Sequence, residues 1–304
     1  MEKKTKKEIL EIIKAKELLK ISKNDLNSSK ILFDYKKYSN AVFCLQQSVE
    51  KSMKAYSVIN KLISFSELKD KIGHNPLRLY SKSAKENISK SKNLSKALEV
   101  KPELKESPMF KKLKLKEFEK GNQRVINIIS QVNNNLILSE DIYELNLVIE
   151  EIKKLIKENI ENPEPIKISK ERIQEIKQNW IVNATPFVEA RKKQEEKIPK
   201  NWEDEVNNIS DKDMRRIIKS SYTILSLGGV SHTINFMLNL FLKPHFDFVR
   251  YPDKKNPLKY YNKSNPLIKK FSEILKIQED NLNLHNKYIR FVLKSEKEGN
   301  QNQK

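Results

Sequence analysis

Histidine is the side chain best suited to acid–base chemistry near neutral pH, and the chain contains four of them. His232 lies inside an apolar stretch and His285 lies on a stripe of apolar residues, which favours a place in the core for both. His74 differs because it follows Gly73 and precedes Pro76, at a break between helices. His74 is therefore the candidate general acid or base, and the alternative is that it orders its turn by hydrogen bonding.

Cleavage of a phosphodiester would also need a cation beside the acid–base group, because negative charge builds up on the phosphate in the transition state. Three cations could take this place if the fold brought them to His74, namely Lys51, Arg78 and Arg250. Gln47 lies close to Lys51 on one predicted helix and could bind the edge of a nucleotide base. The ordinary alternative for polar residues between the apolar positions of a helix is a solvated face.

The composition favours helices throughout. Only five glycines occur in 304 residues, whereas α/β and β-rich folds need more of them for tight turns. The sequence contains neither the glycine-rich string of dinucleotide-binding folds nor that of P-loop proteins. The single cysteine, Cys44, excludes an internal disulfide and a cysteine-based zinc site and fits a reducing cytosol. We therefore expect no cofactor, no metal site and a cytoplasmic location.

The charge balance favours an anionic partner. Sixty basic and 40 acidic residues give a formal net charge of +20, which suits nucleic acid. The lysines are dispersed along the chain, however, and dispersed lysine is also typical of a solvated helical surface. Charge alone leaves both possibilities open.

The clearest helix of the first half is predicted to follow Ser39 and Asn40, either of which could cap it, and to end near Leu62. Its apolar residues recur every four positions and predict one buried stripe. A new helix is expected near Pro76. Residues 81–120 are rich in lysine and weakly periodic, so we expect them to be mobile or loosely helical.

Further helices are predicted in the middle of the chain. Two of them, over 125–136 and 142–156, are expected to lie antiparallel, and Pro163 and Pro165 then mark a linker. Charged helices are expected over 169–219, with breaks at Pro186 and Pro199.

The final third is predicted to contain an apolar helix, a loop and a closing helix. The loop is expected over 243–266, where four prolines occur. Asn265 is the expected cap of the closing helix and Pro266 its first residue, with apolar residues at near-heptad spacing as far as Leu293.

The apolar helix Tyr222–Leu242 has the length that a membrane span needs. His232, Asn235 and Asn239 recur along it at helical spacing, as expected for a helix buried in protein. We therefore expect no membrane span.

Three stretches, taken in order, resemble the HEPN family of helical domains, which are associated with nucleotides and RNA. Residues 24–59 resemble the first helical pair of that family, whose second helix carries a string of the form QQ-x-x-EK-x-x-KA. Here the string consists of Gln46, Gln47, Glu50, Lys51, Lys54 and Ala55.

The other two stretches are shorter. GHNPLRLY at 73–80 resembles the family's His-Asp element, with Asn75 where aspartate is usual. RYPD at 250–253 and the helix from Asn265 resemble its closing loop and last helix. The resemblance implies an all-α, up-down helical bundle with a large helical insertion or a second helical subdomain.

The two halves of this bundle would be far apart in the sequence. Residues 1–80 would form the first half and 221–304 the second half with the closing helix. Residues 81–220 would form the insertion or subdomain. The ends of the chain would then have to lie side by side in one bundle.

Ribonucleases of the family carry an arginine four to six residues before a histidine, and this pair is completed across a dimer. No histidine of this chain has an arginine at that spacing. The resemblance therefore implies a non-catalytic, dimeric protein, with His74 as the one catalytic candidate. The candidate residues for binding RNA or a nucleotide are Gln47, Lys51, Lys54, His74, Arg78, Arg250 and Tyr251.

Three functions remain open at this stage. The first is a non-catalytic protein that binds RNA or a nucleotide-bearing partner, such as a small nucleotidyltransferase, in stress response, toxin–antitoxin pairs or phage defence. The second is a diverged ribonuclease or toxin that acts through His74. The third is an oligomeric scaffold whose charge serves only solubility.

Overall fold

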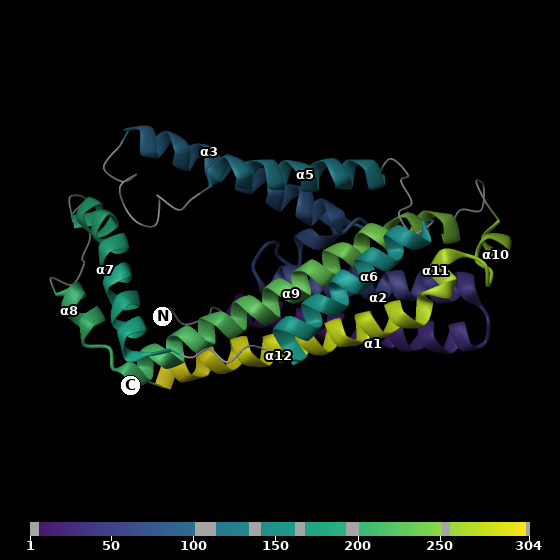
Figure 1. The fold of residues 1–304 in the computed structure, drawn as a ribbon. Helices are drawn as coiled ribbons and strands as arrows, with labels where there is room; N and C mark the ends of the chain where they lie inside the picture. The colour runs from purple at the N-terminus through teal and green to yellow at the C-terminus, as the bar shows by residue number, and fades with distance from the viewer. Residues whose placement is uncertain are drawn as a thin grey trace. The chain divides into compact units, whose positions relative to one another are not determined.

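The computed structural model describes residues 6–100, 114–133, 141–161, 168–192, 201–250 and 256–301. These residues form helices and their connections and contain no strand, so the all-α prediction is confirmed (Figure 1). They divide into two compact units. Unit 1 consists of Met1–Ala84, Arg124–Pro163 and Ile224–Lys304, and unit 2 consists of Lys85–Gln123 and Glu164–Thr223.

Most helices of unit 1 come from the two ends of the chain. They are α1 (Lys6–Asp34), α2 (Tyr38–Ile59), the π-helical turn η1 (Leu68–Ile72), α6 (Ile142–Ile156) with the π-helical turn η4 (Lys157–Glu161), α10 (Pro257–Tyr260), α11 (Pro266–Lys269) and α12 (Phe271–Gln301). Three helices contribute residues to both units, namely α3 (Leu77–Val100), α5 (Leu115–Asn133) and α9 (Asp211–Arg250). Unit 2 also contains α7 (Lys170–Lys192) and α8 (Trp202–Asn207).

The helix α2 is central to the core of unit 1. The predicted stripe is confirmed, because Ala41, Leu45, Val49 and Met53 are all fully buried. Small polar residues let α1 approach α2 closely, and the hydroxyl of Ser22 donates a hydrogen bond of 2.7 Å to the Ser48 carbonyl. The pair of helices α1 and α2 is therefore held by apolar packing and by buried serines together.

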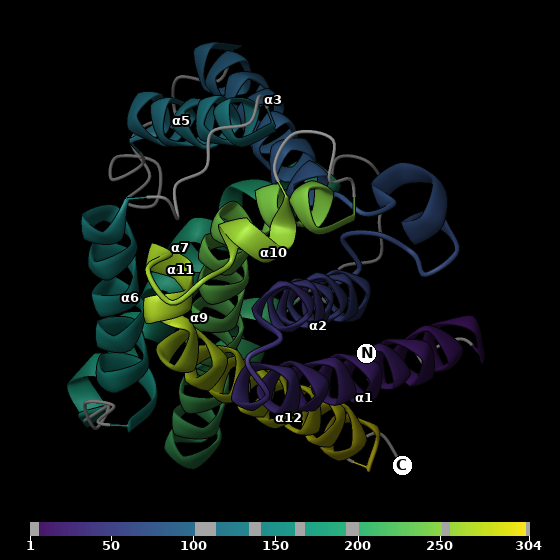
Figure 2. The same cartoon turned by 90° about the vertical axis from the view of Figure 1, so that its right-hand side faces the viewer.

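The two ends of the chain pack against each other in unit 1, as the resemblance required. The hydroxyl of Tyr288, on α12, donates a hydrogen bond of 2.6 Å to Oδ1 of Asn60, just beyond α2. On α1, Lys30 pairs with Glu279 of α12 at 2.9 Å. Figure 2 shows α1, α2 and α12 side by side. The closing helix thus completes the bundle that α1 and α2 begin.

The start of α2 differs from its prediction. The helix begins at Tyr38, and its N-cap, Lys37, makes no side-chain capping bond, so the cap predicted at Ser39 or Asn40 is wrong. Only three residues connect α1 to α2, and Lys36 adopts a positive φ of 59° among them. The amide of Lys37 bonds the Leu32 carbonyl, so the tight turn itself joins the two helices without a side-chain cap.

The region predicted as a proline-rich loop is partly helical. α9 continues through Pro244 as far as Arg250. Proline removes one intrahelical hydrogen bond, which is tolerated here because the flanking Leu242 and Phe246 are buried. The remainder of the predicted loop contains α10, which Asn256 caps by accepting from the amide of Leu258.

The closing helix has the predicted cap. Asn265 accepts hydrogen bonds from the amides of Leu267 and Ile268, and Pro266 is the first helical residue. This helix, α11, ends at Lys269, and a new helix, α12, begins at Phe271. The single helix predicted from the sequence is therefore two helices, because Lys270, with φ −101° and ψ 4°, leaves the helical conformation between them.

The apolar helix α9 passes the length and composition test for a membrane span, over Asp211–Phe246, within the described part of the chain. Half of its most apolar window is buried inside the protein. The hydroxyl of Ser231 donates to Oδ1 of Asn281, on α12, at 2.8 Å. The packing of α9 is thus that of a core helix with polar contacts to its neighbours.

Unit 2 has its own small core of Ile168, Ile173 and Met214. Buried Lys177, on α7, donates hydrogen bonds to the carbonyls of Asn207 and Ile209. α7 runs through position 186, so the break predicted at that proline is wrong, and the predicted break at 199 and linker at 163–165 lie outside the described residues. Of the stretch 81–120, residues 81–100 and 115–120 are helical, and its mobility stays a prediction, as do the predicted domain boundaries.

Candidate functional site

The candidate site is built around Glu50, on the side of α2 that carries the glutamine-rich string. This side is more buried than a solvated face, because Gln46 and Glu50 are almost completely inaccessible. Nε2 of Gln46 donates a hydrogen bond of 3.2 Å to Glu50. A buried carboxylate needs such partners, since an unpaired charge in the interior is costly.

Lys54 is the main counter-charge of Glu50. Its ammonium group lies 2.6 Å from the Glu50 carboxylate, one helical turn away, and it also donates a hydrogen bond of 2.5 Å to the Gly73 carbonyl. Lys54 therefore ties α2 to the turn that follows η1. Gly73 adopts a φ of +57° in this turn, a conformation that favours glycine and that aims the next residue back toward α2.

That next residue is His74, which the turn places over the Glu50 carboxylate. Nδ1 of His74 lies 3.3 Å from Glu50, and the imidazole stacks on the ring of Phe246 at 5.1 Å between centroids. The side chain is nevertheless 62% exposed. A carboxylate beside Nδ1 favours the tautomer that carries its proton there, which leaves Nε2 as the outward nitrogen. This arrangement could take or give a proton at Nε2.

The cations predicted for the site are divided into two groups. Lys51 is held by Asp25 of α1 at 2.6 Å and by Gln47 at 3.1 Å, so it is paired within the protein as Lys54 is. Arg78, in the first turn of α3, is exposed, and no described residue pairs with it. The same holds for Lys69 of η1, which was not among the cations predicted for the site.

Two predicted residues are not placed by the structure. The side chain of Arg250 and the whole of Tyr251 lie outside the described residues. The described residues thus bring Lys54 and His74 to Glu50, whereas Gln47 and Lys51 bond to each other beside Asp25, and Arg78 lies on the following helix.

Sequence reasoning missed two members of this cluster, Glu50 and Phe246. The partners predicted for His74 were all cations, and no carboxylate was among them. Glu50 and Lys54 are spaced as an i, i+4 ion pair, and this was the available signal. No sequence signal could have indicated Phe246, because it comes from α9 and reaches His74 only in the folded chain.

The described residues contain no group of three or more histidine, cysteine, aspartate or glutamate side chains that could hold a metal ion. Cys44 is free and half-buried. Burial, together with the negative charge of Asp25, raises the pKa of its thiol. Cys44 thus lacks the thiolate character of a reactive cysteine.

The other histidine candidates lie in the bundle interior. Burial lowers the pKa of His232, and it lowers that of His285 to about 3. Nε2 of His285 contacts the side-chain amide of Asn235 at 3.0 Å. His285 is a core residue as predicted, whereas His232 is only half-buried, and Nδ1 of each is buried without a hydrogen-bond partner. Neither faces the site at His74, because each packs on the ring of Tyr56.

Comparison with known families agrees with this geometry. Residues 15–139 match the model of the HEPN domain family. The chain contains a HEPN domain over these residues. The match includes Glu50, Lys54 and His74, whereas α9 and α12, which complete the core around α2, lie beyond it. No curated protein and no solved structure matches the chain.

Proposed function

We propose that the HEPN domain binds RNA through the segment Lys69–Arg78, named here the His74 turn, and that it does not cleave the RNA. The observation that carries this proposal is the pairing of Lys51 with Asp25 and of Lys54 with Glu50. These cations are committed to carboxylates, so they cannot stabilise the charge of a cleavage transition state.

Three outward groups of the His74 turn suit phosphate binding, and they outnumber its exposed carboxylate, Asp70. Lys69 and Arg78 are exposed and unpaired among the described residues, and the exposed imidazole of His74 lies between them in sequence. Arginine can bind a phosphate with two parallel hydrogen bonds. The net charge of +20 adds a long-range attraction for any polyanion.

A salt titration of RNA binding tests this proposal. We expect the affinity for a single-stranded RNA oligonucleotide to fall steeply with added salt, because bound counterions are released. Arg78→Ala should weaken binding and reduce the slope of log K against log salt by about 0.7 for each phosphate that the variant no longer binds. The matched control is Arg290→Ala, which removes an exposed arginine of α12. A flat salt response, or an equal loss of affinity in both variants, would refute binding at the His74 turn.

One observation favours a second function, RNA cleavage through His74. The buried Glu50 carboxylate holds Nδ1 of an exposed imidazole, which is the arrangement of an oriented acid–base group. Arg78, four residues after His74, would have to supply the cation. RNA incubated with the wild type would then be cut, and His74→Ala and Arg78→Ala would abolish the cutting. No cleavage by the wild type, or equal cleavage by all three proteins, removes this function.

For the cellular role we propose a cytoplasmic protein of a prokaryotic stress, toxin–antitoxin or phage-defence system that uses no cofactor. A small nucleotidyltransferase is the partner that the family resemblance suggests. A gene for such a protein beside this one, and co-purification of the two products, would support the pairing. A purely scaffolding role would instead combine oligomerisation with no RNA binding at any salt concentration.

A further inference from the structure

The helix α1, with the residue that follows it, has an apolar stripe that nothing covers among the described residues. Its members with large apolar side chains are Leu10, Ile13, Ile21, Ile31 and Tyr35, and each is between 44% and 75% exposed. Glu17, Asn24 and Ser28 share this face because they lie seven residues from other members, which is close to two helical turns. These eight residues are named here the α1 stripe.

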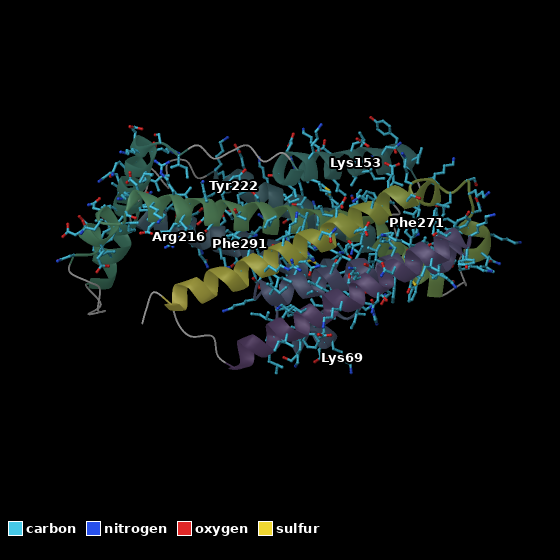
Figure 3. The ribbon with its side chains drawn as sticks, turned by 90° about the horizontal axis from the view of Figure 1, so that it is seen from below. Lys69, Lys153, Arg216, Tyr222, Phe271 and Phe291 are labelled. Carbon is cyan, nitrogen blue, oxygen red and sulfur yellow. The ribbon has the colours of Figure 1, made fainter. Side chains whose placement is uncertain are left out.

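The opposite face of α1 is the one that unit 1 buries. Ala15, Leu19 and Leu26 are core residues there, and Ser22 and Ser29 bond to carbonyls of α2. Figure 3 shows α1 along an edge of unit 1, next to α12. The α1 stripe therefore lies on the outer side of a helix that is already anchored, so its exposure is a property of the folded bundle.

The composition of the α1 stripe is unusual for this protein. One third of the chain is charged and 60 of its residues are basic, yet the stripe contains no lysine or arginine. Glu17 is its one charged member, and this carboxylate is paired with Lys20 on the same helix at 2.7 Å. A long apolar face without cations on a strongly basic surface is typical of a protein interface.

The order of residues along the stripe is nearly palindromic. Two large apolar residues stand at each end, Leu10 with Ile13 and Ile31 with Tyr35, and the polar members lie between them. We propose that the α1 stripe binds the same stripe of a second copy of this chain, with the two helices antiparallel about a two-fold axis near residues 22 and 23. In a two-fold interface, a residue that contacts another is contacted by that same residue in return.

The antiparallel register matches the two ends of the stripe and its charged member, and at the centre it places Ile21 beside Asn24. Leu10 lies against Tyr35 of the other copy, and Ile13 lies against Ile31, so the large apolar side chains meet at both ends. Glu17 lies against Ser28, a neutral residue that can donate a hydrogen bond to a carboxylate. In a parallel pair Glu17 would instead face Glu17, and like charges would repel.

The flanking charges favour the same register. Lys16 and Lys20 flank the first half of the stripe, Lys23 lies on the same side near its centre, and Asn27 and Asp34 flank the second half. An antiparallel pair places Lys16 and Lys20 of one copy beside the half of the other copy that carries Asn27 and Asp34. A parallel pair would place them beside their own copies.

The size of the contact sets the expected affinity. From residue 10 to residue 35 the helix extends about 38 Å, and a strip about 10 Å wide along it covers roughly 400 Å² on each copy. This is about half of the roughly 800 Å² per partner of a standard stable interface, so we expect a dimer of micromolar affinity. Added salt should strengthen it, because each copy carries a charge of +20 and salt screens the repulsion. RNA binding should respond to salt in the opposite direction, so this proposal stands independently of the proposed function.

Cysteine cross-linking tests the register directly. The variant Glu17→Cys and the variant Ser28→Cys, mixed and oxidised, should form a disulfide-linked dimer, because the two positions face each other across the axis. Neither variant alone should form one, since position 17 then lies about 16 Å along the axis from its own copy. The control is the oxidised wild type, which shows whether Cys44 forms a cross-link by itself. Cross-linking by Glu17→Cys alone would overturn the antiparallel register.

Sedimentation over a range of concentrations tests the stripe itself. The double variant Ile13→Gln/Ile31→Gln should remain monomeric at concentrations where the wild type is at least half dimeric. The control is Leu258→Gln, which changes an exposed leucine of α10. A monomeric wild type at every concentration would refute the dimer, and so would a dimer that the double variant leaves unchanged. Helical content measured by circular dichroism shows that each variant is folded.

Discussion

The side-chain amide of Gln278, on α12, donates a hydrogen bond of 3.1 Å to the hydroxyl of Ser48, on α2. These residues are 230 positions apart in the chain, and both are fully buried. The bond belongs to a network whose centre is Asn235 of α9, and the network joins α2, α9 and α12. Because buried polar groups are costly without partners, this network favours one register of the three helices over others.

Asn235→Leu should destabilise the protein strongly. Oδ1 of Asn235 accepts from Ser52 and Asn281, and its amide contacts His285, so the substitution leaves three buried groups short of a partner. We expect the free energy of unfolding to fall by about 3 kcal/mol or more, as measured by chemical denaturation. Asn283→Leu, at an exposed position of α12, is the control and should change little. A decrease below about 1 kcal/mol for Asn235→Leu would mean that water satisfies these groups.

The stability should fall as the pH is lowered from 7 to 5. Burial lowers the pKa of His285 to about 3, whereas the unfolded chain has the ordinary value of 6.5. Below pH 6.5 the unfolded state binds a proton that the folded state does not, so unfolding becomes easier, by about 2 kcal/mol at pH 5. His232 acts in the same direction. The measurement is the free energy of unfolding at several pH values in this window.

A variant distinguishes the contribution of His285 to this pH dependence from the contribution of the carboxylates. His285→Gln keeps an amide for Asn235 and removes the titrating group. Its unfolding free energy should depend less on pH between 7 and 5 than that of the wild type. Equal pH dependence in the two proteins would show that His285 is not the group responsible.

Two ion pairs of the same spacing should differ in their contribution to stability. Lys54→Met leaves the carboxylate of Glu50, 3% exposed, without its main counter-charge, and we expect the free energy of unfolding to fall by about 3 kcal/mol. Lys71→Met removes the pair of Lys71 with Glu67, which is solvent-exposed and should have little effect. Thermal or chemical unfolding of both variants checks this order. Similar decreases would contradict the role assigned to burial.

Substitution by alanine at two neighbouring glycines of α9 should change the free energy of unfolding in opposite directions. A Cβ atom at Gly228 would lie 3.1 Å from the ring of Tyr288, which a hydrogen bond to Asn60 holds in place. Gly228→Ala should therefore lower the free energy of unfolding by about 1 kcal/mol. At Gly229 a Cβ atom would meet nothing within 4 Å, so Gly229→Ala should raise it by about 0.5–1 kcal/mol. Two changes of the same sign would contradict the packing described here.

The helical class and the HEPN resemblance followed from local features of the sequence. Glycine is scarce, the stripe from Ala41 to Met53 has helical spacing, and the 46–55 string is contiguous. The cap at Asn265 was predictable for the same reason, because a cap depends on residues two and three positions away. The continuation of α9 through Pro244 was not predictable, since burial by residues from elsewhere in the chain offsets the missing hydrogen bond.

In the candidate site, too, some features follow from the local sequence and others only from the fold. The sequence by itself identified His74 at its turn and the cations of α2, because glycine, proline and helical spacing act over a few residues. Only the tertiary structure decided that Lys51 and Lys54 are paired, that Glu50 lies under His74, and that Phe246 stacks on it. The reason is physical: whether a charge is free or neutralised depends on which groups the fold brings within a few ångströms, and those come from distant parts of the chain.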